Sequence, residues 1–109
     1  MKNLKENPTI NDIKSHLMSF VSANGWDSKT DTEVFLLFIE EVGEMAKEIR
    51  KKLSLKGEKV DHGEMSGEFA DVLNYLLELA HRMDIDLEQA YRDKFALNAK
   101  RTWPDSNNS

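Results

Sequence analysis

Apolar residues recur at every third or fourth position along most of this chain, a period that predicts helices and not strands. Four helices are expected, over residues 10–24, 31–53, 64–83 and 87–102. The last of these follows Asp86 in the sequence DLEQ, which has the form of a capping box. No hairpin signal links two apolar runs, and both prolines, Pro8 and Pro104, lie near the ends. We therefore predict an all-α protein, folded as an antiparallel four-helix bundle.

The second predicted helix carries six consecutive apolar residues, VFLLFI at positions 34–39. Six such residues in a row cover every side of a helix, so this helix must be contacted from more than one direction. It lies either at the centre of one chain or against a second subunit. We expect the second arrangement, a homodimer or homotetramer that assembles through the second and third helices.

The 109 residues suit one domain, with a core of about 10–103 and frayed polar ends at 1–8 and 104–109. Lys and Arg number 15, Asp and Glu number 20, and the net charge of −5 argues against nucleic acid as a partner. The absence of cysteine excludes disulfides, thiolate catalysis and zinc–thiolate sites. No secretory signal and no membrane span is visible, so we expect a soluble cytoplasmic protein.

Two pairs of acidic residues at a spacing of three lie on the second and third predicted helices: Glu41 with Glu44, and Glu68 with Asp71. Residues three apart share one side of a helix, and Glu41 falls within the apolar side. Two such helices packed together would gather four carboxylates, which stay ionised only around a cation such as Mg²⁺ or Mn²⁺. The alternative is a solvated acidic face, and the residues alone leave both open.

These acids stand in the sequences EEVGE, from position 40, and EFAD, from position 68. The order EExxE and then ExxD on consecutive helices resembles the signature of the all-α NTP pyrophosphohydrolase superfamily. The flanking sequences FIEEVGEMAKEIRK and GEFADVLNYLLELAHRMDIDLEQAYRDKFALNAKR resemble its MazG-like branch. The resemblance covers roughly residues 12–103. It implies a Mg²⁺-dependent enzyme that hydrolyses (d)NTP to (d)NMP and pyrophosphate, with nucleotide-pool house-cleaning as a fitting role.

The resemblance also implies roles for single residues. Glu41, Glu44, Glu68 and Asp71 would coordinate Mg²⁺, with Mn²⁺ as a substitute. Glu40 or Glu44 would orient or deprotonate the attacking water. Glu40 points about 100° away from Glu41 around the helix, so a supporting role behind the metal ligands is equally open for it.

Lys94, Asn98 and Arg101 are spaced at i, i+4 and i+7 and share one face of the fourth predicted helix. Two cations and an amide in line suit a triphosphate chain, and the family has a similar pattern there. A solvated face is the alternative. Trp26 lies in the first loop, where the resemblance implies an aromatic residue that stacks on the base, and a packing role is equally open. Asn74 is expected to line the substrate site.

Three other interpretations compete with this one. A di-iron carboxylate bundle needs Glu-x-x-His on two helices, and the sequence offers one such pair, Glu78 and His81. A non-catalytic helical oligomer of the same fold is the second, and a phosphoribosyl-ATP pyrophosphohydrolase is the third. We predict the nucleoside triphosphate pyrophosphohydrolase, because the acidic positions are intact and the flanking residues resemble the MazG-like branch better.

Overall fold

The computed structural model describes residues 3–54 and 59–101. It contains the helices α1 (Ile10–Ala23), α2 (Asp31–Lys52), α3 (His62–Arg82) and α4 (Leu87–Lys100), and one 3₁₀ turn, η1 (Trp26–Ser28). The predicted all-α class and the four helices are confirmed, and the described residues contain no strand. The predicted helix ends agree to within two residues, because polar side chains cap the helices where the pattern of apolar residues begins.

The capping bonds differ from the prediction at two helices. At the start of α1, the Thr9 hydroxyl accepts from the Asp12 N–H over 3.0 Å, and the Asp12 carboxylate accepts from the Thr9 N–H over 2.9 Å. This complete capping box was not predicted. At α4, Asp86 accepts from the Gln89 N–H over 3.0 Å. In a capping box, the Gln89 side chain would bond back to the Asp86 N–H. Here the Gln89 amide donates to Asp93 over 2.9 Å instead, so only half of the predicted box forms.

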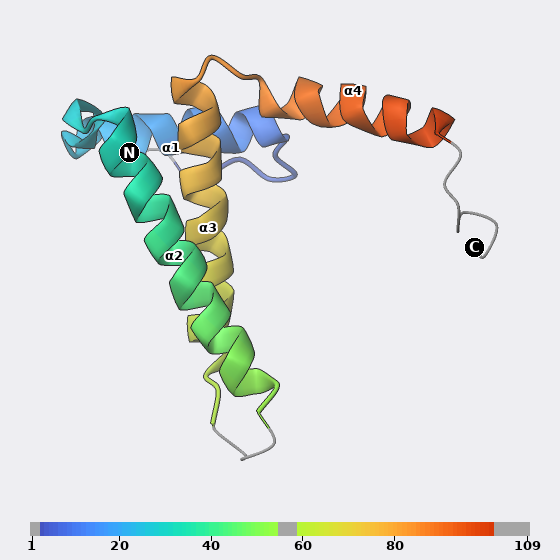
Figure 1. The fold of residues 1–109 in the computed structure, drawn as a ribbon. Helices are drawn as coiled ribbons and strands as arrows, with labels where there is room; N and C mark the ends of the chain where they lie inside the picture. Colours follow the sequence, from blue (N-terminus) through green and yellow to red (C-terminus); the bar gives the residue numbers. More distant parts are fainter. Residues whose placement is uncertain (1–2, 55–58, 102–109) are drawn as a thin grey trace.

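The helices α2 and α3 run side by side and antiparallel, and α1 crosses this pair near one end (Figure 1). The most deeply buried side chains are Val34 of α2 and Leu77 of α3. Val21 of α1 and Ala80 of α3 complete the set of buried apolar side chains among the described residues. The core is therefore small and sits where α1, α2 and α3 meet, with long stretches of α2 and α3 beyond it.

The fourth helix leaves this core and extends as an arm (Figure 1). Its main packing partner is the start of α1, where the Glu88 carboxylate accepts from the free N–H of Asn11 over 3.1 Å. The radius of gyration is 17.3 Å, whereas a compact chain of this length has about 13 Å. The four helices consequently do not close into a bundle within one chain.

The turn between α3 and α4 is a Schellman motif. The Asp84 N–H donates to the His81 carbonyl over 3.1 Å, and the Ile85 N–H donates to the Ala80 carbonyl over 2.8 Å. Asp84 adopts a left-handed conformation with φ of 60°, a conformation that favours glycine. This turn directs the arm away from the core.

Some of the predicted segments lie outside the residues that the structure describes, and the start of the third helix differs from the prediction. The predicted frayed segment 104–109 lies outside the described part, as do residues 55–58 between the second and third predicted helices. The third helix begins two residues earlier than predicted, because the Asp61 carboxylate accepts from the Glu64 N–H and starts α3 at His62. No helix within residues 3–54 and 59–101 combines the length and apolar character needed to cross a membrane.

Candidate metal and nucleotide site

Three of the four predicted metal ligands come together across the interface between α2 and α3. Glu41 projects from α2, and Glu68 and Asp71 project from α3, three residues apart and thus on one side of that helix. Each residue offers a carboxylate oxygen, and these oxygens all lie within 4.8 Å of one another. The antiparallel pairing of the two helices therefore builds a three-carboxylate cluster.

The surroundings of Glu41, the one carboxylate that α2 contributes to the cluster, strongly disfavour its ionisation. Burial raises the pKa of Glu41 to about 7, helped by a hydrogen bond with Glu68 and by the negative charges of Asp71, Glu68 and Glu40. The pKa of the neighbouring Tyr75 is also raised, first by burial and then by negative charges that include Glu41. The local field is thus strongly negative, as a cation-binding site requires.

The cluster fits a hard divalent cation. The Glu68 Oε2 atom is buried and has no hydrogen-bond partner, although buried polar atoms are nearly always paired. A cation held by the three carboxylates would satisfy this atom and offset the repulsion among them. Because every donor is a carboxylate oxygen, the set suits Mg²⁺ or Mn²⁺ better than a metal that prefers nitrogen or sulfur.

The remaining predicted acids lie beside the cluster. Glu44 is exposed and is not part of the three-residue group, although it follows Glu41 by one turn of α2. Glu40 is also exposed, and its charge contributes to the raised pKa of Glu41. The structure does not support the competing di-iron site. Glu78, one of its expected ligands, forms an ion pair with Arg82 at 3.0 Å, and the described carboxylate cluster contains no histidine.

A pocket of about 280 Å³ adjoins the cluster and shares Asp71 with it. The pocket is lined from α1, η1 and α3 by Leu17, Phe20, Val21, Trp26, Asp71, Asn74, Tyr75 and Glu78. Trp26 is 45% exposed and contacts the edge of Phe20, with ring centroids 5.5 Å apart. Lys29 Nζ lies 5.5 Å from the Trp26 ring centroid. Trp26 and Asn74, both predicted to bind substrate, thus lie in one pocket beside the acidic residues.

Several residues that line this pocket, among them Phe20, Tyr75 and Glu78, were not predicted to do so. Tyr75 and Glu78 follow Asp71 by four and seven positions, so helical spacing already placed them on the same side of α3. Phe20 could not be found in this way, because its place opposite α3 depends on how α1 crosses the helix pair. The pocket combines an aromatic wall, an amide and a carboxylate, a set that suits the base and sugar of a nucleotide.

The predicted phosphate-binding residues are not brought to the cluster of the same chain. Lys94 is exposed and Asn98 is half-buried on α4, and Arg101 directly follows that helix. The arm leads away from the α2–α3 pair (Figure 1). These residues can therefore reach an acidic cluster only if it belongs to another copy of the chain or if the arm moves.

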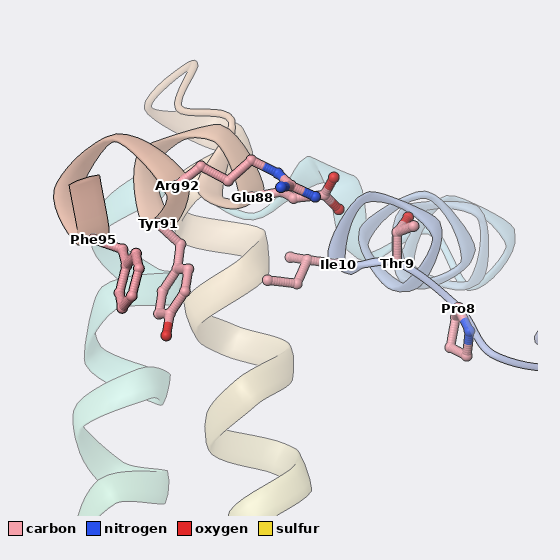
Figure 2. A pocket seen from close by; sticks show the side chains of 7 residues that line it. All are labelled: Pro8, Thr9, Ile10, Glu88, Tyr91, Arg92 and Phe95. Carbon is pink, nitrogen blue, oxygen red and sulfur yellow. The ribbon is translucent and has the colours of Figure 1, made fainter. Parts of the chain in front are cut away.

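A second, larger pocket of about 530 Å³ lies between the start of α1 and the arm. Figure 2 shows its lining, which is Pro8, Thr9, Ile10, Glu88, Tyr91, Arg92 and Phe95. Tyr91 and Phe95 are stacked with centroids 6.4 Å apart, and they are 66% and 63% exposed. None of the clustered carboxylates lines this pocket, so it offers an apolar surface rather than a centre for chemistry.

Fold and site together define an all-α protein with a carboxylate cluster on two antiparallel helices and a pocket of about 280 Å³ beside it. Residues 29–101 match the family of the MazG nucleotide pyrophosphohydrolase domain. The chain belongs to this family, and the predicted resemblance is confirmed. The match covers α2, α3 and α4 and begins just after Trp26. No curated protein matches the chain.

Proposed function

We propose that this protein is a Mg²⁺-dependent nucleoside triphosphate pyrophosphohydrolase that converts (d)NTP to (d)NMP and pyrophosphate. The observation that carries the proposal is the carboxylate cluster of Glu41, Glu68 and Asp71 with its unpaired buried oxygen, next to the pocket that holds Trp26. Membership of the MazG family supports the same reaction. A role in clearing unwanted nucleotides from the cytoplasm fits this activity.

Glu41, Glu68 and Asp71 would hold Mg²⁺, with Mn²⁺ as a substitute, and Glu44 would join them from the next turn of α2. A metal bound there would supply Lewis-acid polarisation of phosphoryl oxygens and would screen the negative charge that develops on the pyrophosphate. Because Asp71 belongs to both the cluster and the pocket, the triphosphate chain would lie at the cluster and the base would lie toward the pocket.

Hydrolysis between the α and β phosphates requires a water molecule and a group that accepts its proton. Glu40 or Glu44, both exposed beside the cluster, would orient the water and take the proton as the new phosphorus–oxygen bond forms. The bond to the bridging oxygen then breaks and pyrophosphate leaves. The described residues of the pocket offer no serine or cysteine nucleophile, so direct attack by water is the simplest route.

Trp26 and Asn74 would bind the nucleoside part of the substrate. Trp26 presents a partly exposed indole ring that can stack on a base, an interaction that contributes about 1–3 kcal/mol. Asn74 offers both a donor and an acceptor, as base edges do. Their location in one pocket supports this assignment.

Self-association would complete the site. Apolar side chains are exposed on α2 (Phe35, Leu36 and Ile39) and on α3 (Phe69, Leu73 and Leu76). A chain with so small a core gains stability when a second copy covers these faces. In a homodimer or homotetramer, the arm of one copy could bring Lys94, Asn98 and Arg101 to the acidic cluster of its partner.

The reaction is tested by separating the products formed from canonical and modified NTPs and dNTPs, with Mg²⁺ and with EDTA. We expect equal amounts of nucleoside monophosphate and pyrophosphate from the wild type with Mg²⁺, and none with EDTA. Glu41→Gln and Glu68→Gln should lower kcat by at least about a hundredfold, because each removes one charged metal ligand. Glu33→Gln is the matched control, since Glu33 is an exposed acid of α2 outside the cluster.

Other products would point to other functions. Orthophosphate as the first product would mean that a different bond is cleaved. Turnover of phosphoribosyl-ATP alone would favour the rival enzyme. No turnover and no Mg²⁺-dependent nucleotide binding would favour the non-catalytic oligomer.

The assembly is tested separately by sedimentation of the wild type and of Leu36→Glu. Leu36 is 61% exposed in the single chain, so this change should leave the helical content intact while charging the proposed interface. We expect an oligomer for the wild type and a smaller species for the variant. A monomeric wild type would contradict the proposed assembly.

A further inference from the structure

Arg82, the last residue of α3, joins two parts of the chain that are far apart in sequence. Its side chain is 13% exposed. Its Nη1 donates to the Lys29 carbonyl oxygen over 2.7 Å and to Asp31 Oδ1 over 3.1 Å. Its Nε and Nη2 atoms lie 3.1 and 3.0 Å from Oε2 of Glu78. One guanidinium therefore fastens the connection between η1 and α2 to the end of α3.

The fastened connection carries the aromatic wall of the pocket. The Lys29 N–H donates to the Trp26 carbonyl over 3.3 Å and closes the η1 turn, and Lys29 Nζ lies near the Trp26 ring. The Ser28 hydroxyl adds a bond of 3.1 Å to the Gly25 carbonyl. Because the turn is closed on itself, holding the Lys29 carbonyl also holds the backbone of Trp26.

The other side of the contact belongs to the helix that carries the chemistry. Glu78 is 6% exposed and lines the pocket together with Asp71 and Trp26. Arg82 itself is not among the residues that line the pocket. A buried ion pair adds little net stability compared with apolar packing. Its main effect here is geometric, since a guanidinium with several fixed donors holds its partners at set distances.

We propose that Arg82 is a positioning residue for nucleotide binding, which holds Trp26 opposite Asp71 and so sets the spacing between the aromatic wall and the acidic cluster. Trp26 and Asp71 come from different elements. Without Arg82, the η1 turn would keep its edge contact with Phe20 and its covalent ends, and its distance from α3 would vary. This inference rests on the proposed function, because it assigns Trp26 to the base and Asp71 to the phosphates.

The decisive variant is Arg82→Lys. It keeps a positive charge beside Glu78 and so protects the fold, but one ammonium group cannot reach Glu78, the Lys29 carbonyl and Asp31 together. We expect the KM for a good nucleoside triphosphate to rise about tenfold, within the range that base stacking contributes. The kcat at saturation should stay within about twofold, because the acidic cluster is unchanged. The inhibition constant of inorganic tripolyphosphate, which has no base, should not change.

A second comparison separates positioning from general damage to the fold. In a Trp26→Ala background, Arg82→Lys should raise KM no further, because the two residues act through one contact with the base. Arg92→Met, which removes an exposed arginine of the arm, serves as the matched control.

Each outcome decides between the two proposals. An unchanged KM in Arg82→Lys, an equal loss of tripolyphosphate binding, or full additivity with Trp26→Ala would each overturn the role of Arg82 while leaving the hydrolase intact. If the wild type shows no turnover, the wild type and Arg82→Lys are compared by their nucleotide dissociation constants, measured by calorimetry. If the wild type binds no nucleotide either, the proposed function and the role of Arg82 fail together.

Discussion

The carboxylate of Glu41 on α2 faces that of Glu68 on α3, with one oxygen of each within 4.8 Å of the other, so the two helices meet through a pair of acids as well as through apolar side chains. The Oε2 atom of Glu68 is buried and unpaired. An arrangement of this kind weakens the interface unless a cation is bound, because like charges are brought together away from water. Function and stability are therefore opposed at this point of the fold.

The first prediction concerns pH in the absence of metal. The pKa of Glu41 is raised from 4.5 to about 7, so the folded state holds this proton more tightly than the unfolded state. Stability should therefore fall as pH rises from about 4.5 to about 7 and stay low above that, by about 1–3 kcal/mol. Urea unfolding in EDTA at several pH values measures this loss. In Glu41→Gln the loss should be absent, and a wild type that gains stability over this range would contradict the assignment.

The second prediction concerns the cation. Mg²⁺ at about a hundred times its dissociation constant should stabilise the folded wild type by about 2.7 kcal/mol through mass action. The thermal midpoint at pH 8 should rise accordingly, and EDTA should reverse the rise. Glu68→Gln should lose most of this response, whereas Glu33→Gln should keep it. Equal midpoints with Mg²⁺ and with EDTA would mean that the acids bind no metal.

The third prediction concerns the arm. In the proposed oligomer, each site takes Glu41 from one copy and Lys94 from another. A Lys94→Met chain therefore damages its partner's site, whereas a Glu41→Gln chain damages its own. In a mixed dimer, one site then carries both lesions and the other carries neither. Co-refolding the two inactive variants in equal amounts should restore about a quarter of the wild-type activity. No recovery in verified mixed dimers would place Lys94 and Glu41 in the same site of one chain.

The fourth prediction concerns the turn before the arm. Asp84 has a φ of 60°, where a side chain is disfavoured and glycine is not. Asp84→Gly should therefore stabilise the protein by about 0.5–1 kcal/mol in chemical unfolding. Asp93→Gly, the same change inside α4, should instead destabilise it by about 0.3–1 kcal/mol, because glycine has a lower helix propensity and the bond from the Gln89 amide is lost. Destabilisation by both changes would show that Asp84 contributes something beyond its backbone conformation.

The helices and the acidic residues were predictable because both depend on local spacing. Apolar periodicity and capping residues located α2 and α3, and the spacing of Glu68 and Asp71 placed both on one side of α3. The antiparallel return of a helix hairpin then brings Glu41 near them. These conclusions need no knowledge of contacts far apart in the sequence.

The rest depended on long-range contacts that no spacing encodes. Arg82 and Lys29 are separated by 53 positions, and Glu88 and Asn11 by 77. Their bonds fix where the Trp26 turn and the arm lie. For this reason the four helices of the predicted antiparallel bundle do not pack together within one chain: α4 follows its contacts with α1 and leaves the faces of α2 and α3 open.

The family match begins at Lys29, between the aromatic wall and the acidic helices. The aromatic side of the pocket, which α1 and its following turn supply and which we propose contacts the base together with Asn74, is thus separable along the chain from the helices that carry the carboxylate cluster. Arg82 is the joint between them. Transplanting residues 10–28 from one homologue onto another, with this joint retained, offers a route to exchange substrate preference while the hydrolytic centre stays untouched.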